Sequence, residues 1–171
     1  EAIYDFLKKK IKKKLTFVNN LNSNANYFQD KSINLNLIIS KSGNTLETIA
    51  NTNTLIKSRE NNIIITESKD SYLTNLAEKL KAEIFEHKNY VGGRYSVLSE
   101  VGMLPAELMN LNESKFKQFN NIIKNKALVN NLINNVAATL NLIKDGRYTS
   151  IILNYDEQSE SLFKWYQQLV A

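Results

Sequence analysis

Short apolar runs alternate with amphipathic segments along the first half of the chain. The apolar runs have the length and the β-branched or aromatic content of buried strands, and they occupy residues 35–40, 62–66 and 82–86. Between them, apolar residues recur at spacings of three and four, which predicts helices over 45–59 and 71–81. The order of these elements is that of parallel βαβ units.

The rest of the chain carries helical periodicity with few strand signals. Further helices are predicted over 2–15, 100–110, 114–125, 128–142 and 159–170, and two further strands over 16–21 and 149–154. No internal repeat and no clear domain boundary interrupts the pattern. We therefore expect residues 1–171 to form a single unit.

The predicted fold class is α/β. We expect a three-layer sandwich built on a mostly parallel, doubly wound sheet of the flavodoxin-like kind, with helices on both faces. In such sheets, ligands bind beyond the carboxyl ends of the strands. Two loops, at residues 40–45 and 92–94, follow predicted strands and can therefore reach one crevice.

The turn after the first apolar run has the composition of an anion site. Ser40, Ser42 and Thr45 supply hydroxyls, and Gly43 allows the backbone to approach a ligand closely. Lys41 either adds a positive charge or points away and offers its backbone N–H alone. Unpaired N–H groups and the helix dipole favour an anion at the start of the following helix.

Helix capping is the simpler interpretation of the same turn. Asn44 or Ser42 at the N-cap, with Glu47 reaching back, would form a capping box. The two interpretations are compatible. The turn lacks the Walker A pattern, which argues against a nucleoside triphosphate.

Composition excludes several classes of protein. The chain has no cysteine, so disulfides, thiolate nucleophiles and cysteine-based metal sites are ruled out. The net charge of +5 owes much to lysines at 8–10 and 12–14, which lie on a predicted amphipathic helix. We interpret them as a solvated face and expect neither a nucleic-acid nor a membrane partner. No apolar run is long enough to cross a membrane.

Two segments resemble known proteins. Residues 40–48, Ser-Lys-Ser-Gly-Asn-Thr-Leu-Glu-Thr, are similar to the phosphate-binding segment of sugar isomerase domains. Residues 91–102, Val-Gly-Gly-Arg-Tyr-Ser-Val-Leu-Ser-Glu-Val-Gly, resemble the signature of the glucose-6-phosphate isomerase family. Glu100 departs from the small residue usual there. The likeness extends to residues 162–169, Leu-Phe-Lys-Trp-Tyr-Gln-Gln-Leu.

The resemblance implies interconversion of glucose 6-phosphate and fructose 6-phosphate through an enediol, in glycolysis and gluconeogenesis. Arg94 would be catalytic and stabilise the enediolate. The phosphate would be bound by Ser40, Lys41, Ser42 and Thr45, and the sugar by Gly93 and Gln168 (or its neighbour Gln167). The family further implies no cofactor or metal, a cytoplasmic location and a homodimer.

Some family features are expected to lie outside these residues. The family's Gly-Gly-Ser loop and first strand would precede residue 1, and its catalytic Glu would follow Ala171, to which residues 159–171 lead. His87 is the only histidine and does not match the family's catalytic one, so a surface or packing role is expected. Glu100 and Glu107 fit ordinary helix positions.

Two other functions remain open at this stage. Sugar isomerase domains also serve as non-catalytic sensors of sugar phosphates, and as the isomerase half of an amidotransferase that makes glucosamine phosphate. Both would share the loop at 40–45, and neither requires the Gly-Gly-Arg segment.

Because the proton-transferring base is expected outside these residues, the purified chain should show no isomerase activity by itself. A coupled assay of fructose 6-phosphate conversion tests this. Turnover by the pure 171-residue chain would contradict it.

Overall fold

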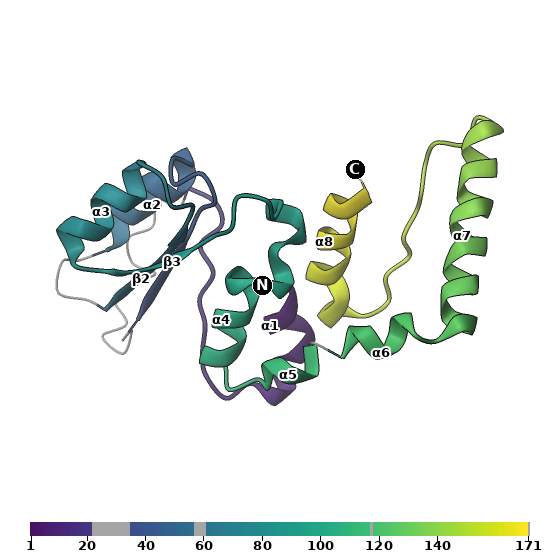
Figure 1. Cartoon of the computed structure of the whole chain (residues 1–171), viewed down its shortest axis with the longest axis horizontal. Helices are drawn as coiled ribbons and strands as arrows, with labels where there is room; N and C mark the ends of the chain where they lie inside the picture. The colour runs from purple at the N-terminus through teal and green to yellow at the C-terminus, as the bar shows by residue number, and fades with distance from the viewer. Residues whose placement is uncertain (22–34, 57–60, 117, 171) are drawn as a thin grey trace.

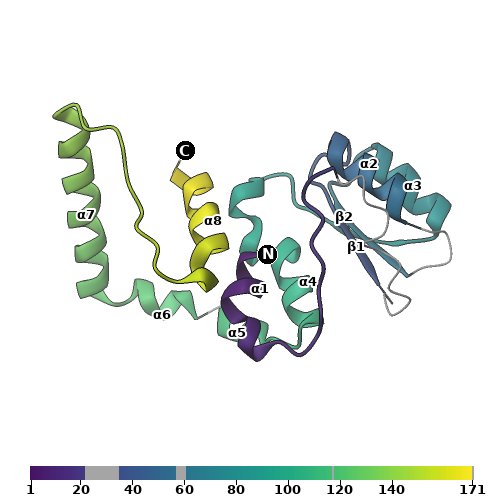
Figure 2. The same ribbon diagram turned by 180° about the vertical axis from the view of Figure 1, so that it is seen from behind.

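The computed structural model describes residues 1–21, 35–56, 61–116 and 118–170 (Figure 1). Residues 22–34 and the end of the helix expected at 45–59 lie outside the described residues. Two packed units and a projecting helix make up the described chain, as both views show (Figures 1 and 2).

The first unit is a three-stranded parallel sheet in the order β1-β2-β3. Its strands are β1 (Asn36–Ile39), β2 (Asn62–Thr66) and β3 (Glu83–Glu86), and its helices are α2 (Leu46–Leu55) and α3 (Tyr72–Leu80). Both helices lie on the same side of the sheet (Figures 1 and 2). The predicted α/β class, the parallel strands and the alternating order are confirmed.

The core of this unit lies between the sheet and α3. Ile38 and Ile64 are paired across β1 and β2, and they pack with Leu73 and Ala77 of α3. Ile65, on the opposite face of β2, is also fully buried. A central strand buried on both faces explains why 62–66 is apolar almost throughout.

The second unit is helical and packs around Met103, Ala106 and Met109. It contains α1 (Ala2–Leu7), the 3-10 helices η1 (Lys8–Lys10), η3 (Gly93–Leu98) and η4 (Glu157–Ser159), and the helices α4 (Glu100–Leu108), α5 (Glu113–Phe116) and α8 (Glu160–Val170). A hydrogen bond from Ser161 of α8 to Asp5 of α1 joins the two ends of the described chain.

Two helices lead away from this unit. α6 (Phe119–Ile123) is followed by α7 (Lys126–Lys144), which projects from the rest of the molecule (Figure 1). Apolar residues of α7 are exposed, including Leu132, Val136 and Leu140 at 53–58%. Within the part of the chain that the structure describes, neither α7 nor any other helix combines the length and apolar content needed to span a bilayer.

The helix predicted over 2–15 is wrong beyond its first turns. α1 ends at Leu7, a 3-10 turn follows, and Ile11 has an extended backbone. Lysines at 8–10 and 12–14 would stack like charges four residues apart on a helix, which is unfavourable. Ile11 and Leu15 instead reach the Met103 cluster from an extended chain.

Two predicted strands are also wrong. Residues 16–21 and 149–154 form no strand in the structure. A strand needs a partner for its backbone groups, and neither segment pairs with the described sheet. Ile151 and Leu153 are 78% and 72% exposed. The helix predicted over 114–125 is divided into α5 and α6.

Gly102→Ala should destabilise the helical unit. A Cβ at Gly102 would lie 1.9 Å from the Val97 carbonyl oxygen, so η3 and α4 would have to separate. We expect a loss of about 1–3 kcal/mol in the free energy of unfolding, measured by urea denaturation. Gly93→Ala is the matched control, since a Cβ there meets no atom within 4 Å. Equal stability of the two variants would contradict the close packing.

Candidate functional site

The loop between β1 and α2, residues 40–45, gathers hydroxyl groups at the carboxyl end of β1. Ser40 is 5% exposed, and its backbone N–H donates to the Ile65 carbonyl over 3.1 Å. The hydroxyls of Ser40 and Thr45 share a hydrogen bond of 2.8 Å, which ties the two ends of the loop together. Ser42, between them, is exposed to solvent.

Gly43 allows this loop to sit directly on the start of α3. Its φ is +69°, and a Cβ would lie 2.2 Å from Ser71 Oγ. The Gly43 carbonyl accepts from the Leu73 N–H over 3.1 Å, and the Asn44 side-chain oxygen accepts from the Tyr72 N–H over 2.8 Å. The position of the β1–α2 loop is therefore fixed by α3.

The capping box expected at the start of α2 is wrong. Asn44 contacts α3 instead, and Ser42 Oγ accepts from the Asn44 N–H over 3.2 Å. The N-cap of α2 is Thr45, and its side chain makes no capping hydrogen bond, whereas α3 has a reciprocal box between Ser71 and Thr74. In the described part of the chain, the first N–H groups of α2 thus have no capping side chain, which favours an anion there.

Lys41 connects this loop to the loop that follows β3. Its Nζ donates to the carbonyls of Asn89 and Val91 over 3.0 and 2.9 Å. Glu67 lies 3.6 Å from the same Nζ and also pairs with Lys69 over 2.5 Å. The hydrogen bond from Lys69 and the charges of both lysines hold the pKa of Glu67 below its usual value. The Lys41 side chain thus joins two loops at the carboxyl edge of the sheet.

The second loop, residues 88–99, carries Arg94 and is called the Arg94 loop below. Within it, the Ser96 hydroxyl donates to the Gly93 carbonyl over 2.6 Å, and Ser96 is 5% exposed. The indole N–H of Trp165, on α8, donates to the Arg94 carbonyl over 2.9 Å. Internal hydrogen bonds and α8 therefore hold the backbone around Arg94.

A hollow of about 750 Å³ lies between the sheet and the helical unit. Gly93 and Arg94 line it from the Arg94 loop, and Gln168 lines it from α8. Ile39, which is followed directly by Ser40, lines it from β1. Arg94 and Gln168, far apart in the sequence, therefore line one cavity, and Ile39, the residue that precedes the β1–α2 loop, borders it on the sheet side.

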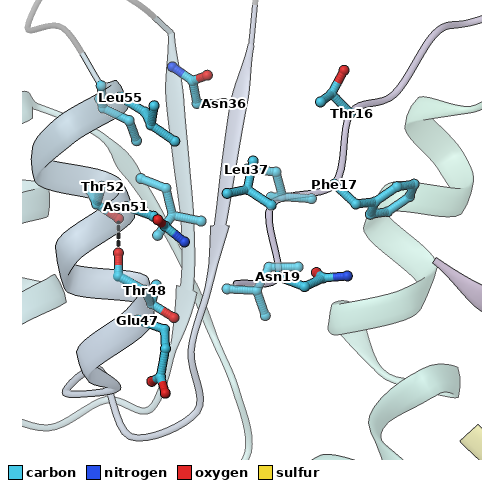
Figure 3. A pocket seen from close by; sticks show the side chains of 14 residues that line it. Thr16, Phe17, Asn19, Asn36, Leu37, Glu47, Thr48, Asn51, Thr52 and Leu55 are labelled. Carbon is cyan, nitrogen blue, oxygen red and sulfur yellow. Dashed lines mark hydrogen bonds between the residues drawn. The ribbon is translucent and has the colours of Figure 1, made fainter. Parts of the chain in front are cut away.

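A second hollow, of about 300 Å³, runs beside β1 (Figure 3). Phe17 and Asn19 line it from the extended N-terminal segment, and Glu47 and Asn51 line it from α2. Figure 3 shows these side chains on the two sides of β1. Since β1 is the outer strand of the described sheet, this hollow lies at a sheet edge.

Comparison with known proteins now decides the family. A family model described as phosphoglucose isomerase matches residues 2–170, nearly the whole chain. The chain belongs to the phosphoglucose isomerase family. The match covers both the β1–α2 loop and the Arg94 loop, as well as α8.

Several curated relatives are named glucose-6-phosphate isomerase. The chain is 34% identical to a glucose-6-phosphate isomerase of Methanocaldococcus jannaschii, with 82% of this chain and 39% of the relative covered. It is 28% identical to that of Leptospira interrogans, covering 84% and 35%. It is also 30% identical to a probable glucose-6-phosphate isomerase of Methanococcus maripaludis, covering 78% and 33%. The chain thus spans little more than a third of their length.

The site residues predicted from the resemblance to the phosphoglucose isomerase family lie in two places in the structure. Ser40, Lys41, Ser42 and Thr45 lie in the β1–α2 loop, whereas Gly93, Arg94 and Gln168 line the larger hollow. Lys41 connects the two groups.

Sequence reasoning missed Trp165 and Glu67. The indole of Trp165 holds the Arg94 carbonyl, and Glu67 holds Lys41. Both contacts depend on tertiary structure. Trp165 lies in the segment 162–169 that resembles the family, but no pattern indicated its contact with Arg94, and none marked Glu67. His87 is 2% exposed, so of the two expected places, at the surface or packed in the interior, it occupies the second.

Glu67→Gln should weaken the link between the two loops in a pH-dependent way. Because the folded-state pKa of Glu67 is lowered, its stabilising effect is complete above about pH 4.5 and is lost as the pH falls through the lowered pKa. We expect a lower melting temperature than wild type at pH 7 and no difference in strong acid. Glu78→Gln, at an exposed position of α3, is the control. A pH-independent difference would contradict the ion pairs.

Proposed function

We propose that this chain carries the hexose-phosphate-binding part of a glucose-6-phosphate isomerase. The observation that carries the proposal is the Lys41 contact, because it joins a hydroxyl-rich helix N-terminus to the loop that contains the Gly-Gly-Arg segment. The names of the curated relatives favour this activity over a sensor or an amidotransferase half.

The phosphate group would bind at the β1–α2 loop. Ser40, Ser42 and Thr45 offer hydroxyl donors, and the first N–H groups of α2 offer backbone donors without a side-chain cap. Lys41 contributes its backbone N–H and the local positive charge, while its Nζ is engaged with the Arg94 loop. This arrangement suits a dianion held at one end of a small sugar.

The reacting carbons would lie in the larger hollow. Aldose–ketose interconversion removes a proton from one of two adjacent carbons and returns it to the other through an enediol, so negative charge develops on oxygen. The guanidinium of Arg94 is suited to stabilise that oxyanion. Gly93 allows close approach, and Gln168 is placed to bind sugar hydroxyls.

The proton-transferring base is proposed to lie elsewhere in the full-length protein, after the segment 159–171. The relatives, of which this chain covers 33–39%, leave ample length for it. Residues 1–171 would then be one sugar isomerase domain of a doubly wound, three-layer type. We further propose that the full-length protein is a cytoplasmic homodimer. It would act in glycolysis and gluconeogenesis without a cofactor.

Arg94→Ala should separate catalysis from binding in the full-length enzyme. Loss of one oxyanion-stabilising group costs about 10²–10³-fold in kcat, and KM should change far less because the phosphate site is intact. Steady-state kinetics with fructose 6-phosphate measures both. Arg147→Ala, at an exposed position, is the matched control and should behave as wild type.

A variant of the phosphate site should affect KM more than kcat. Ser40→Ala should raise KM by about tenfold with a smaller effect on kcat, since it removes a contact that substrate and transition state share. A variant with Arg94→Ala that keeps full kcat, or Ser40→Ala that keeps the wild-type KM, would contradict the proposed roles.

A further inference from the structure

The base of the Arg94 loop is closed by two titratable side chains that the proposed mechanism does not use. His87 immediately precedes the loop, and Glu100 immediately follows it. His87 Nδ1 lies 3.7 Å from Glu100 Oε1, across the two ends of the loop. This contact links the residue at which the loop leaves the sheet to the residue at which it enters α4.

His87 is anchored deep in the sheet unit. Its side chain is 2% exposed, and its backbone N–H donates to the Thr66 carbonyl at the end of β2 over 2.8 Å. Its Nδ1 also lies 3.1 Å from the Lys88 carbonyl oxygen. The Lys88 carbonyl oxygen and Glu100 Oε1, the two groups near Nδ1, are both acceptors, so we place a proton on that nitrogen.

Glu100 has a buried carboxylate oxygen that lacks a hydrogen-bond donor among the described residues. Within the described residues, its Oε1 is buried and has no hydrogen-bond partner, although its side chain as a whole is 25% exposed. A buried carboxylate oxygen without a donor is costly. The Nδ1–H group of His87, which also faces the Lys88 carbonyl at 3.1 Å, lies 3.7 Å from this oxygen. That distance is longer than a hydrogen bond, so the N–H dipole offsets only part of the cost.

We infer that His87 and Glu100 are positioning residues, which act through the Arg94 loop to place the Arg94 guanidinium over the substrate hollow. The inference rests on the proposed function for its catalytic consequence. Its structural part does not depend on that function. Lys41 holds the first half of the loop and Trp165 holds the Arg94 carbonyl, so the His87–Glu100 contact supplies the anchor at the base.

Replacement of His87 by asparagine or by glutamine tests its two ring nitrogens separately. The side-chain amide nitrogen of asparagine lies near the position of Nδ1, whereas that of glutamine lies near Nε2. His87→Asn should therefore retain the donor to Glu100, and His87→Gln should lose it. Glu100→Ala removes the acceptor, and Glu107→Gln on the exposed side of α4 is the control.

The single tryptophan of the chain reports on the loop directly. Trp165 donates to the Arg94 carbonyl, so movement of the loop changes its fluorescence. In the 171-residue chain, we expect His87→Gln and Glu100→Ala to shift the emission to longer wavelength and to increase quenching by acrylamide. His87→Asn and Glu107→Gln should match wild type. Circular dichroism confirms that each variant is folded, and Glu100→Gln replaces Glu100→Ala if the latter unfolds.

The catalytic consequence is measured in the full-length enzyme. Misplacement of a catalytic group by about 1 Å can cost up to 10²-fold in rate, so we expect His87→Gln to lower kcat by roughly tenfold or more with little change in KM. His87→Asn should restore kcat. Folded variants with unchanged Trp165 fluorescence and unchanged kcat would overturn the inference. If the full-length wild type has no isomerase activity, the proposed function fails, and the fluorescence alone decides the positioning role.

Discussion

The contact on which the candidate site depends is the one that Lys41 Nζ makes with the carbonyls of Asn89 and Val91. Parallel strands bring their carboxyl ends to one edge of a sheet, but the loops there need a physical link to act together. Lys41 supplies it. Within the described residues, Lys41 makes the side-chain hydrogen bonds that join the hydroxyl-rich turn directly to the loop after β3, and the proposed site needs the two loops to keep a defined separation.

The other contacts of the site keep that link in a defined place. Gly43 lets the β1–α2 loop lie on α3, Glu67 supports the Lys41 ammonium, and Trp165 holds the Arg94 carbonyl from α8. The buried His87 anchors the base of the Arg94 loop to the sheet. In the proposed function, phosphate binding and stabilisation of a developing oxyanion would fall to different elements, which these contacts hold together.

Sequence patterns predicted the elements whose signal is local. The strands of the sheet were predicted because short apolar runs with turn residues around them have few other stable structures. The prediction of a helix over 2–15 was wrong because it relied on the apolar periodicity. It neglected the repulsion among the lysines at 8–10 and 12–14. The strand at 149–154 failed because strand formation depends on a partner. The direction of the Lys41 side chain and the meeting of His87 with Glu100 depend on packing, which no local pattern contains.

The most direct test of the central claim is an NMR titration of the ¹⁵N-labelled chain with glucose 6-phosphate. We expect the backbone amides of residues 41–46 and 92–94 to shift together with one dissociation constant, because Lys41 links the two loops. Inorganic phosphate should shift the first group far more strongly than the second. Shifts confined to one loop with glucose 6-phosphate, or two different dissociation constants, would contradict the account.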